Sequence, residues 1–227
     1  MSVRKPARIY LVRHGHSTAN GKAILAGRDP KVELSDLGVE QAGALAGALA
    51  SVEFSELFSS PLKRCLQTME PVMAKFSKAQ ISQLPGVIEM DYGKWSGRKL
   101  ALLSREKLWS SIQSTPSLVR FPEGESFHEM SARANESIRS IARPGKNILV
   151  CSHGDVIKAI IAGITGLHLD NLQRLTIDPA SISIIELIGD SGRLIMMNEI
   201  SHLSQKKRAK GSRQDRNLGG GSGGSRK

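Results

Sequence analysis

Short apolar runs recur along this chain, and most of them end in glycine or in polar residues. The clearest runs are 7–13 and 146–151, and the second contains Ile148, Leu149 and Val150 in succession. Continuous apolar runs of this length, bounded by turn residues, are typical of strands buried inside a sheet. Further strands are expected at 56–60, 79–84, 181–187 and 193–200.

Longer segments between these runs have the spacing and the start signals of helices. Ser35 or Asp36 is a typical N-cap for a helix that extends to about residue 49. Pro61 suits the first position of a helix that extends to about residue 76, because the missing N–H of proline costs nothing there. Other helices are expected at 98–112, 125–142 and 155–164.

The alternation of strands and helices predicts the fold class. Strands that are separated by helices form a mostly parallel sheet with both faces covered, which is an α/β fold with three layers, α/β/α. The last two predicted strands are separated only by a turn at 189–192. We therefore expect an antiparallel hairpin at one edge of the sheet.

The composition is that of a globular protein, but the charge is unevenly distributed. Hydrophobic residues make up 40% of the 227 residues, and the formal net charge is +11. Residues 204–227 contain eight Lys and Arg residues against one acid, Asp215, together with many glycines and serines. Such a segment cannot bury enough apolar surface to offset its ordering entropy. We expect one folded domain at 1–203 and a disordered basic tail at 204–227.

The same features limit the classes of partner. No apolar run approaches the roughly 18 residues of a membrane span, and the two cysteines, Cys65 and Cys151, exclude a disulfide scaffold. We therefore expect a cytoplasmic protein with no membrane partner. The tail leaves open a non-catalytic module that binds polyanions. It contains no aromatic residue to stack on bases, so we expect no nucleic-acid binding beyond non-specific contacts.

Candidate chemistry gathers where the predicted strands end. Arg13 and His14 follow the first strand, His153 follows the strand at 146–151, and each histidine precedes a glycine, which allows a sharp turn. Arg64 lies in the first turn of the helix after the strand at 56–60, and Glu89 follows the weak strand. Because ligands bind at the carboxyl ends of parallel strands, these side chains are expected around one anion, which guanidinium groups match well.

The candidate residues belong to a longer series of short motifs. In chain order these are Leu-Val-Arg-His-Gly (11–15), Asn20, Leu-Ser-Asp-Leu-Gly-x-x-Gln-Ala (34–42), Ser-Ser-Pro-Leu-x-Arg-x-x-x-Thr (59–68), Glu-x-x-Tyr-Gly-x-Trp-x-Gly (89–97), Gly-Glu-Ser (124–126) and Ser-His-Gly-Asp (152–155). This series resembles the histidine phosphatase superfamily, the phosphoglycerate mutase-like proteins, over about residues 7 to 200. The segments 25–28 and 175–181 further resemble an actinobacterial branch of phosphomutases or phosphatases.

The resemblance implies a role for each of these side chains. It makes His14 the nucleophile that forms a phosphohistidine, and Arg13, Arg64 and His153 the groups that hold the phosphoryl oxygens. It makes Glu89 the acid and base, without metal or cofactor. The additional residues expected to contact the phosphate or the rest of the substrate are Ser17, Asn20, Arg28, Tyr92, Gly154 and Asp155.

The resemblance includes both phosphatases and mutases. Mutases of this family have a long insertion before the second histidine, with an Arg-Arg pair that binds the substrate carboxylate, whereas residues 109–121 contain only Arg120. We therefore expect hydrolysis of a small phosphorylated metabolite, with phosphomutase activity as the alternative. A low-charge lining is expected from Leu100, Leu102, Leu103, Leu108 and Trp109. The physiological substrate and a homodimer remain open.

Overall fold

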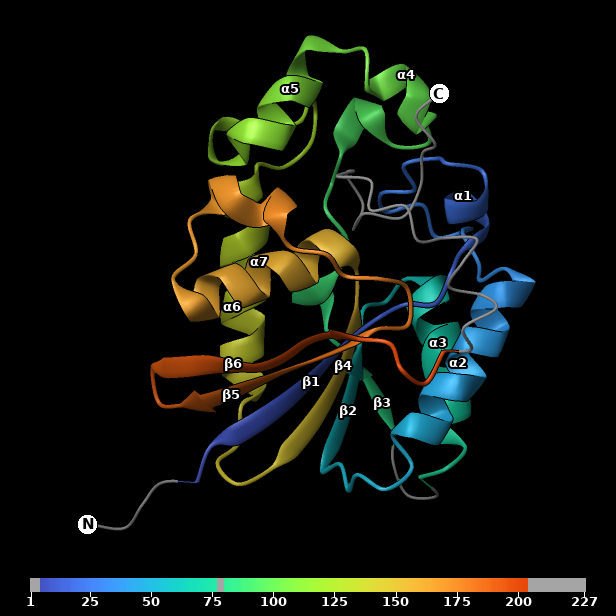
Figure 1. The fold of residues 1–227 in the computed structure, drawn as a ribbon, viewed down its shortest axis with the longest axis vertical. Coiled ribbons are helices and arrows are strands. Elements are labelled where there is room, and N and C mark those ends of the chain that lie inside the picture. Colours follow the sequence, from blue (N-terminus) through green and yellow to red (C-terminus); the bar gives the residue numbers. More distant parts are fainter. Residues whose placement is uncertain (1–4, 77–79, 204–227) are drawn as a thin grey trace.

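The computed structural model describes residues 5–76 and 80–203, so the predicted tail lies outside the described residues. Six strands form one sheet in the order β3-β2-β4-β1-β5-β6 (Figure 1). β1, β2, β3 and β4 run parallel, whereas β5 runs antiparallel to both β1 and β6. This arrangement confirms the predicted α/β fold. The strands are β1 (Ala7–Arg13), β2 (Glu56–Ser59), β3 (Ile81–Gln83), β4 (Asn147–Ser152), β5 (Ile182–Ile188) and β6 (Ser191–Glu199).

Helices cover both faces of this sheet, as the alternating pattern predicts. Alternate residues of β1 point to opposite faces. Ile9 and Leu11 share one apolar core with α6 and α7, whereas Tyr10 and Val12 share another with α2 and α3 (Figure 1). The α-helices are α1 (Thr18–Gly21), α2 (Asp36–Ala48), α3 (Lys63–Met73), α4 (Leu100–Leu103), α5 (Lys107–Ser114), α6 (Phe127–Ile141) and α7 (Gly154–Thr165).

Short 3₁₀ turns fill several of the connections. Their positions were not predicted, since elements of three to six residues leave little periodicity in a sequence. They are η1 (Pro85–Val87), η2 (Gly93–Trp95), η3 (Pro116–Leu118) and η4 (Leu169–Arg174).

The single helix predicted at 98–112 is wrong, because the chain forms α4 and α5 instead. The Ser104 hydroxyl donates to the Ala101 carbonyl at 3.1 Å, and a serine that bonds to nearby backbone favours the end of a helix. Glu106 then has extended backbone dihedrals ahead of α5. An ion pair with an N–O distance of 2.6 Å joins Arg98, which precedes α4, to Glu106, which precedes α5.

Two other boundaries differ from the prediction. α3 begins at Lys63 rather than Pro61, because the Ser60 hydroxyl accepts from the Leu62 N–H and makes a turn first. The hairpin turn is shorter than predicted, since β6 already begins at Ser191. Gly189 has a φ of +57°, a left-handed conformation that glycine adopts without strain.

The parallel pairing brings three strand ends to one edge of the sheet. Arg13 of β1 is opposite Ser152 of β4, and Ser59 of β2 is opposite Cys151 of β4. His14, Ser60 and His153 follow these positions directly, so they emerge side by side. No helix in the described ranges 5–76 and 80–203 has the length and apolar character needed to cross a membrane.

Candidate active site

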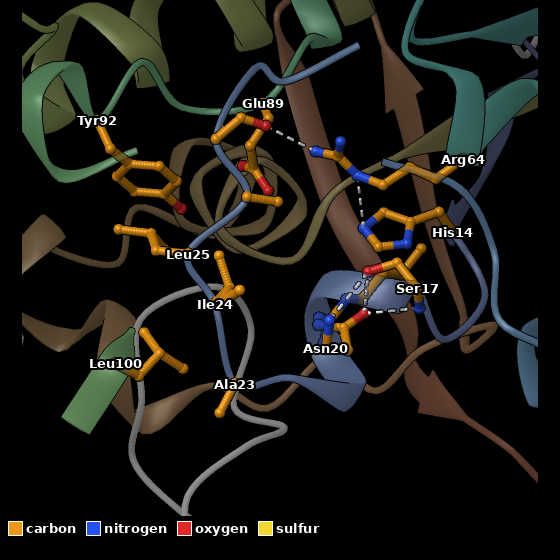
Figure 2. Close-up of a pocket in the computed structure, with 13 residues that line it drawn as sticks. His14, Ser17, Asn20, Ala23, Ile24, Leu25, Arg64, Glu89, Tyr92 and Leu100 are labelled. Carbon is orange, nitrogen blue, oxygen red and sulfur yellow. Dashed lines mark hydrogen bonds between the residues drawn. The ribbon is translucent and has the colours of Figure 1, made fainter. Parts of the chain in front are cut away.

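A pocket opens at this edge of the sheet (Figure 2). Its volume is about 450 Å³ including the open mouth. It brings together Arg13, His14, Arg64 and Glu89 of the predicted residues, with the buried His153 beside them. The lining residues are Arg13, His14, Ser17, Asn20, Ala23, Ile24, Leu25, Ala26, Gly27, Arg64, Glu89, Tyr92 and Leu100.

The His14 ring has the geometry of a nitrogen nucleophile. Its Nδ1 lies 2.7 Å from the Gly15 carbonyl oxygen, so Nδ1 carries the proton and donates to it. The lone pair of Nε2 therefore faces the pocket, where it accepts a hydrogen bond from the Nε–H of Arg64 at 3.3 Å. Burial, followed by the charges of Arg64 and Arg13, holds the pKa of His14 well below its ordinary value. The ring is thus neutral at physiological pH.

Gly15 allows the loop that carries His14 to pack closely against its neighbours. A Cβ at Gly15 would lie 2.7 Å from the Gly38 carbonyl oxygen, which is closer than real contacts allow. The Gly15 N–H also donates to the Thr68 hydroxyl at 3.0 Å. The loop after β1 therefore packs directly on α2 and α3, and only glycine fits there.

Arg64 and Arg13 place two buried positive charges next to His14. Arg64 Nη2 donates to the Gly27 carbonyl at 2.9 Å. Its Nη1 is buried and has no hydrogen-bond partner among the described residues. Arg13 Nη1 donates to the Ile177 carbonyl at 2.5 Å, and burial lowers the pKa of its guanidinium. Such donors are suited to the oxygens of a phosphoryl group.

His153 is the N-cap of α7, and its ring faces that of His14 with centroids 5.2 Å apart. Arg64 Nη2 donates to Nδ1 at 3.2 Å, so the proton of the ring lies on Nε2, which donates to the Ser60 hydroxyl at 2.8 Å. Burial and the Arg64 charge hold the pKa of His153 well below its ordinary value. Ser60 belongs to the motif at 59–68, but nothing in that motif indicates that its hydroxyl orients the ring of His153.

The Glu89 carboxyl lies next to these histidines and arginines. One oxygen, Oε2, lies 3.6 Å from His153 Nδ1, and the other accepts from the Met90 N–H at 2.9 Å. Burial, with the nearby Asp155 charge, raises the pKa of Glu89 to about 7. A carboxyl with this pKa exchanges its proton readily at neutral pH.

Ser17 and Asn20 line the pocket next to His14 (Figure 2). Their role as phosphate ligands stays a prediction. They form a capping box at the start of α1, in which the Asn20 side-chain oxygen accepts from the Ser17 N–H and hydroxyl, each at 2.9 Å. The cap fixes both side chains at the pocket wall.

Tyr92 lines the pocket, but Gly154 and Asp155 are not among its lining residues. The Tyr92 hydroxyl donates to Asp155 Oδ2 at 2.7 Å. Asp155 Oδ1 pairs with the buried Lys158 Nζ at 3.7 Å. Asp155 therefore holds the Tyr92 hydroxyl through this hydrogen bond and does not line the pocket itself. Gly154 opens α7 directly after His153.

Arg28 is also absent from the lining residues. Its Nε donates to the backbone carbonyl of Glu89 at 2.9 Å, and its Nη2 pairs with Glu125 Oε1 at 3.1 Å. The structure thus places Arg28 against the segment that carries Glu89, and its contact with the substrate stays a prediction.

An apolar wall faces these charged residues. Leu100 lines it as expected, but Leu103 is fully buried in the core and Trp109 stacks on Trp95. The remaining apolar lining comes from Ala23–Ala26, which the sequence did not indicate. In the described part of the chain, no three His, Cys, Asp or Glu side chains form a group able to hold a metal ion.

Comparison with known proteins agrees with this geometry. Residues 9–200 match the model of the histidine phosphatase superfamily (branch 1). The 2,3-bisphosphoglycerate-dependent phosphoglycerate mutase of Thermoplasma acidophilum is 29% identical, over 84% of this chain and 92% of that protein. The metal-independent phosphoserine phosphatase of Arabidopsis thaliana is 27% identical, over 86% and 83%. The structure of Bacillus stearothermophilus YhfR superposes with a TM-score of 0.81 at 26% identity, over 87% and 99%. The chain therefore belongs to the histidine phosphatase superfamily and is an enzyme of that class.

Proposed function

We propose that the chain hydrolyses small phosphate monoesters through a phosphohistidine on His14. The observation that carries the proposal is the neutral Nε2 of His14, which lies 3.3 Å from the Arg64 guanidinium in a pocket shared with Glu89. Phosphoryl transfer needs a nucleophile, cations that bind the phosphoryl oxygens, and a group that gives and takes a proton. His14, the pair Arg13 and Arg64, and Glu89 with its pKa of about 7 supply these parts.

The first step transfers the phosphoryl group to the enzyme. When the ester binds, the Nε–H of Arg64 passes from His14 Nε2 to a phosphoryl oxygen and frees the lone pair. His14 Nε2 then attacks phosphorus while the bond from phosphorus to the ester oxygen breaks. Protonated Glu89 gives its proton to that oxygen, so the leaving group departs as an alcohol. Arg13 and Arg64 neutralise the phosphoryl oxygens in the transition state, where Nη1 of Arg64 still has a free donor.

The second step returns the enzyme to its starting state. The Glu89 carboxylate takes a proton from water as the water oxygen attacks phosphorus. The bond between phosphorus and Nε2 breaks, inorganic phosphate leaves, and His14 is again neutral. Each turnover consumes one ester and one water and yields one alcohol and one phosphate.

The wall opposite Arg13 and Arg64 favours hydrolysis of an ester with an uncharged leaving group over mutase chemistry. The wall consists of Ala23–Ala26 and Leu100. Arg13 and Arg64 are the only Lys or Arg side chains among the lining residues of the described chain, and both are needed for the phosphoryl group. A substrate carboxylate, which a phosphoglycerate mutase must hold, would find no third cation there. We propose that the leaving group is neutral and at least partly apolar.

A panel of phosphate monoesters tests this function, with phenyl phosphate, phosphoserine and phosphoglycerate measured with and without a bisphosphoglycerate primer. We expect phosphate release from every ester, the highest kcat/KM for phenyl phosphate, and no effect of the primer. The matched variant His14→Ala should be inactive on all three. Isomerisation of phosphoglycerate that depends on the primer and releases no phosphate would overturn the hydrolase proposal in favour of a mutase.

A further inference from the structure

The segment that carries Glu89 has little regular structure of its own. η1 ends at Val87, and Glu89 follows without helix or strand. The Ser152 hydroxyl ties the segment to β4 through the Val87 carbonyl at 2.8 Å. Beyond that point no strand ladder fixes the backbone, although a general acid has to lie within hydrogen-bond reach of the leaving oxygen.

Arg133 of α6 supplies a second attachment. Its Nη1 donates to the carbonyls of Gly86 and Ile88, both at 2.8 Å, and its Nη2 donates to the carbonyl of Glu89 at 3.1 Å. The Arg133 side chain thus binds three of the four backbone carbonyls in residues 86–89. The planar guanidinium suits this task, because its donors are fixed relative to one another.

Glu125 holds Arg133 in turn. Arg133 donates from Nε to Glu125 Oε2 at 3.0 Å and from Nη2 to Oε1 at 2.6 Å. The Arg133 and Glu125 side chains are only 22% and 13% exposed, so solvent screens this pair weakly. Arg28 bonds the same Glu125 oxygen and also the Glu89 carbonyl, as described above. Two guanidinium groups from distant parts of the chain therefore meet at the Glu89 backbone.

Neither arginine is among the pocket-lining residues. Their donors lie on the carbonyl of Glu89, whereas its carboxyl projects into the pocket (Figure 2). Their hydrogen bonds therefore reach the site through the backbone of Glu89. The charge of Arg133 also lowers the pKa of His153, and a lysine at position 133 would keep that charge.

We infer that Arg133, held by Glu125, is a positioning residue that fixes the Glu89 carboxyl against the leaving oxygen, with Arg28 as a second attachment. The inference rests on the proposed role of Glu89 as the acid. If that role holds, loosening the segment selectively slows esters whose leaving group needs a proton. An ester of an acidic phenol expels a stable phenolate that needs no proton, so its rate falls little when the acid is misplaced.

Arg133→Lys tests the inference, because lysine keeps the charge but cannot make the five hydrogen bonds together. The measurement is kcat/KM, which reports steps up to cleavage of the ester bond, for butyl phosphate and for dinitrophenyl phosphate. We expect a loss of about 10- to 100-fold on butyl phosphate, as for a misplaced group, and a much smaller loss on dinitrophenyl phosphate. The ratio of the two values does not depend on the folded fraction.

Arg120→Lys is the matched control, because Arg120 forms a comparable pair with Glu129 of α6 but is 60% exposed. It should change neither value. Equal losses on both esters in Arg133→Lys would overturn the positioning role. If Arg133→Lys does not fold, Arg28→Lys is measured in the same way, and equal losses there overturn it.

Glu89→Gln separates this inference from the proposed function. It should lose far more on butyl phosphate than on dinitrophenyl phosphate. If Glu89→Gln loses equally on both, the acid role of Glu89 is wrong. If Glu89→Gln is selective and Arg133→Lys is not, only the positioning inference is wrong.

Discussion

Replacing Glu89 with glutamine is expected to slow hydrolysis and, above neutral pH, to stabilise the fold. The Glu89 carboxyl is buried, and its pKa is raised to about 7 mainly by that burial. The protein therefore holds a proton there over a range of pH in which the unfolded chain has lost it. Glutamine has similar shape but neither donates a proton to the leaving oxygen nor ionises.

The pKa fixes the size and sign of the stability change. The gap between the ordinary 4.5 and about 7, at about 1.36 kcal/mol per pH unit, corresponds to about 3 kcal/mol. Because the folded-state pKa is raised, the free energy of unfolding falls as pH rises through this window, and the whole amount is lost above the folded-state pKa. Glu89→Gln removes that fall, so its stability relative to the parent should rise by about 3 kcal/mol between acidic and alkaline pH.

The same pKa sets the pH profile of the parent enzyme. Glu89 is about half protonated at pH 7, so kcat/KM for butyl phosphate should fall about tenfold per pH unit above that value. Losing the acid should lower kcat/KM by about 10²- to 10⁴-fold below pH 7, as is typical of general acids, and should abolish the alkaline fall.

Urea unfolding and steady-state kinetics across the same buffers measure both effects. Each is compared between the parent and Glu89→Gln, so groups that titrate in both proteins cancel. A stability difference that stays constant with pH would refute the raised pKa. A parent kcat/KM that still rises above pH 9 would refute the assignment of Glu89 as the acid.

Three further predictions concern other parts of the molecule. Ser60→Ala removes the acceptor of the His153 Nε2–H, so kcat/KM should fall about tenfold, and unchanged kinetics would contradict the role of Ser60. Tyr92→Phe leaves the buried Asp155 without one donor and should cost about 1–3 kcal/mol in urea unfolding, whereas an unchanged midpoint would show that this hydrogen bond contributes nothing. Deleting 204–227 removes eight basic residues, so retention on a polyanion column should be lost while kcat/KM is unchanged. A parallel loss of activity would tie the tail to catalysis.

Much of the fold could be predicted because the apolar runs of β1 and β4 are buried on both faces. Such strands are continuous in sequence and leave a clear signal. The break between α4 and α5 was missed because it depends on a serine hydroxyl and on the Arg98–Glu106 pair rather than on periodicity. The turn before β6 was predicted too long, because the strand continues through residues that are themselves common in turns.

The grouping of His14, Arg64 and His153 could also be predicted, since each follows a predicted strand and the carboxyl ends of parallel strands lie at one edge of the sheet. Their roles stay predictions until they are tested by experiment. The hydrogen bonds of Arg133 could not be foreseen. Arg133 reaches the backbone near Glu89 across more than 40 positions of sequence, and an exposed-looking helical arginine gives no sign of that.

The claim that His14 carries the phosphoryl group is tested most directly by locating that group during turnover. The enzyme is mixed rapidly with dinitrophenyl phosphate, quenched in alkali to preserve phosphohistidine, digested, and analysed by mass spectrometry. We predict one phosphoryl group on the peptide that contains His14, at the ring nitrogen that faces Arg64. A phosphoryl group on another residue, or turnover with no phosphorylated histidine, would contradict the account.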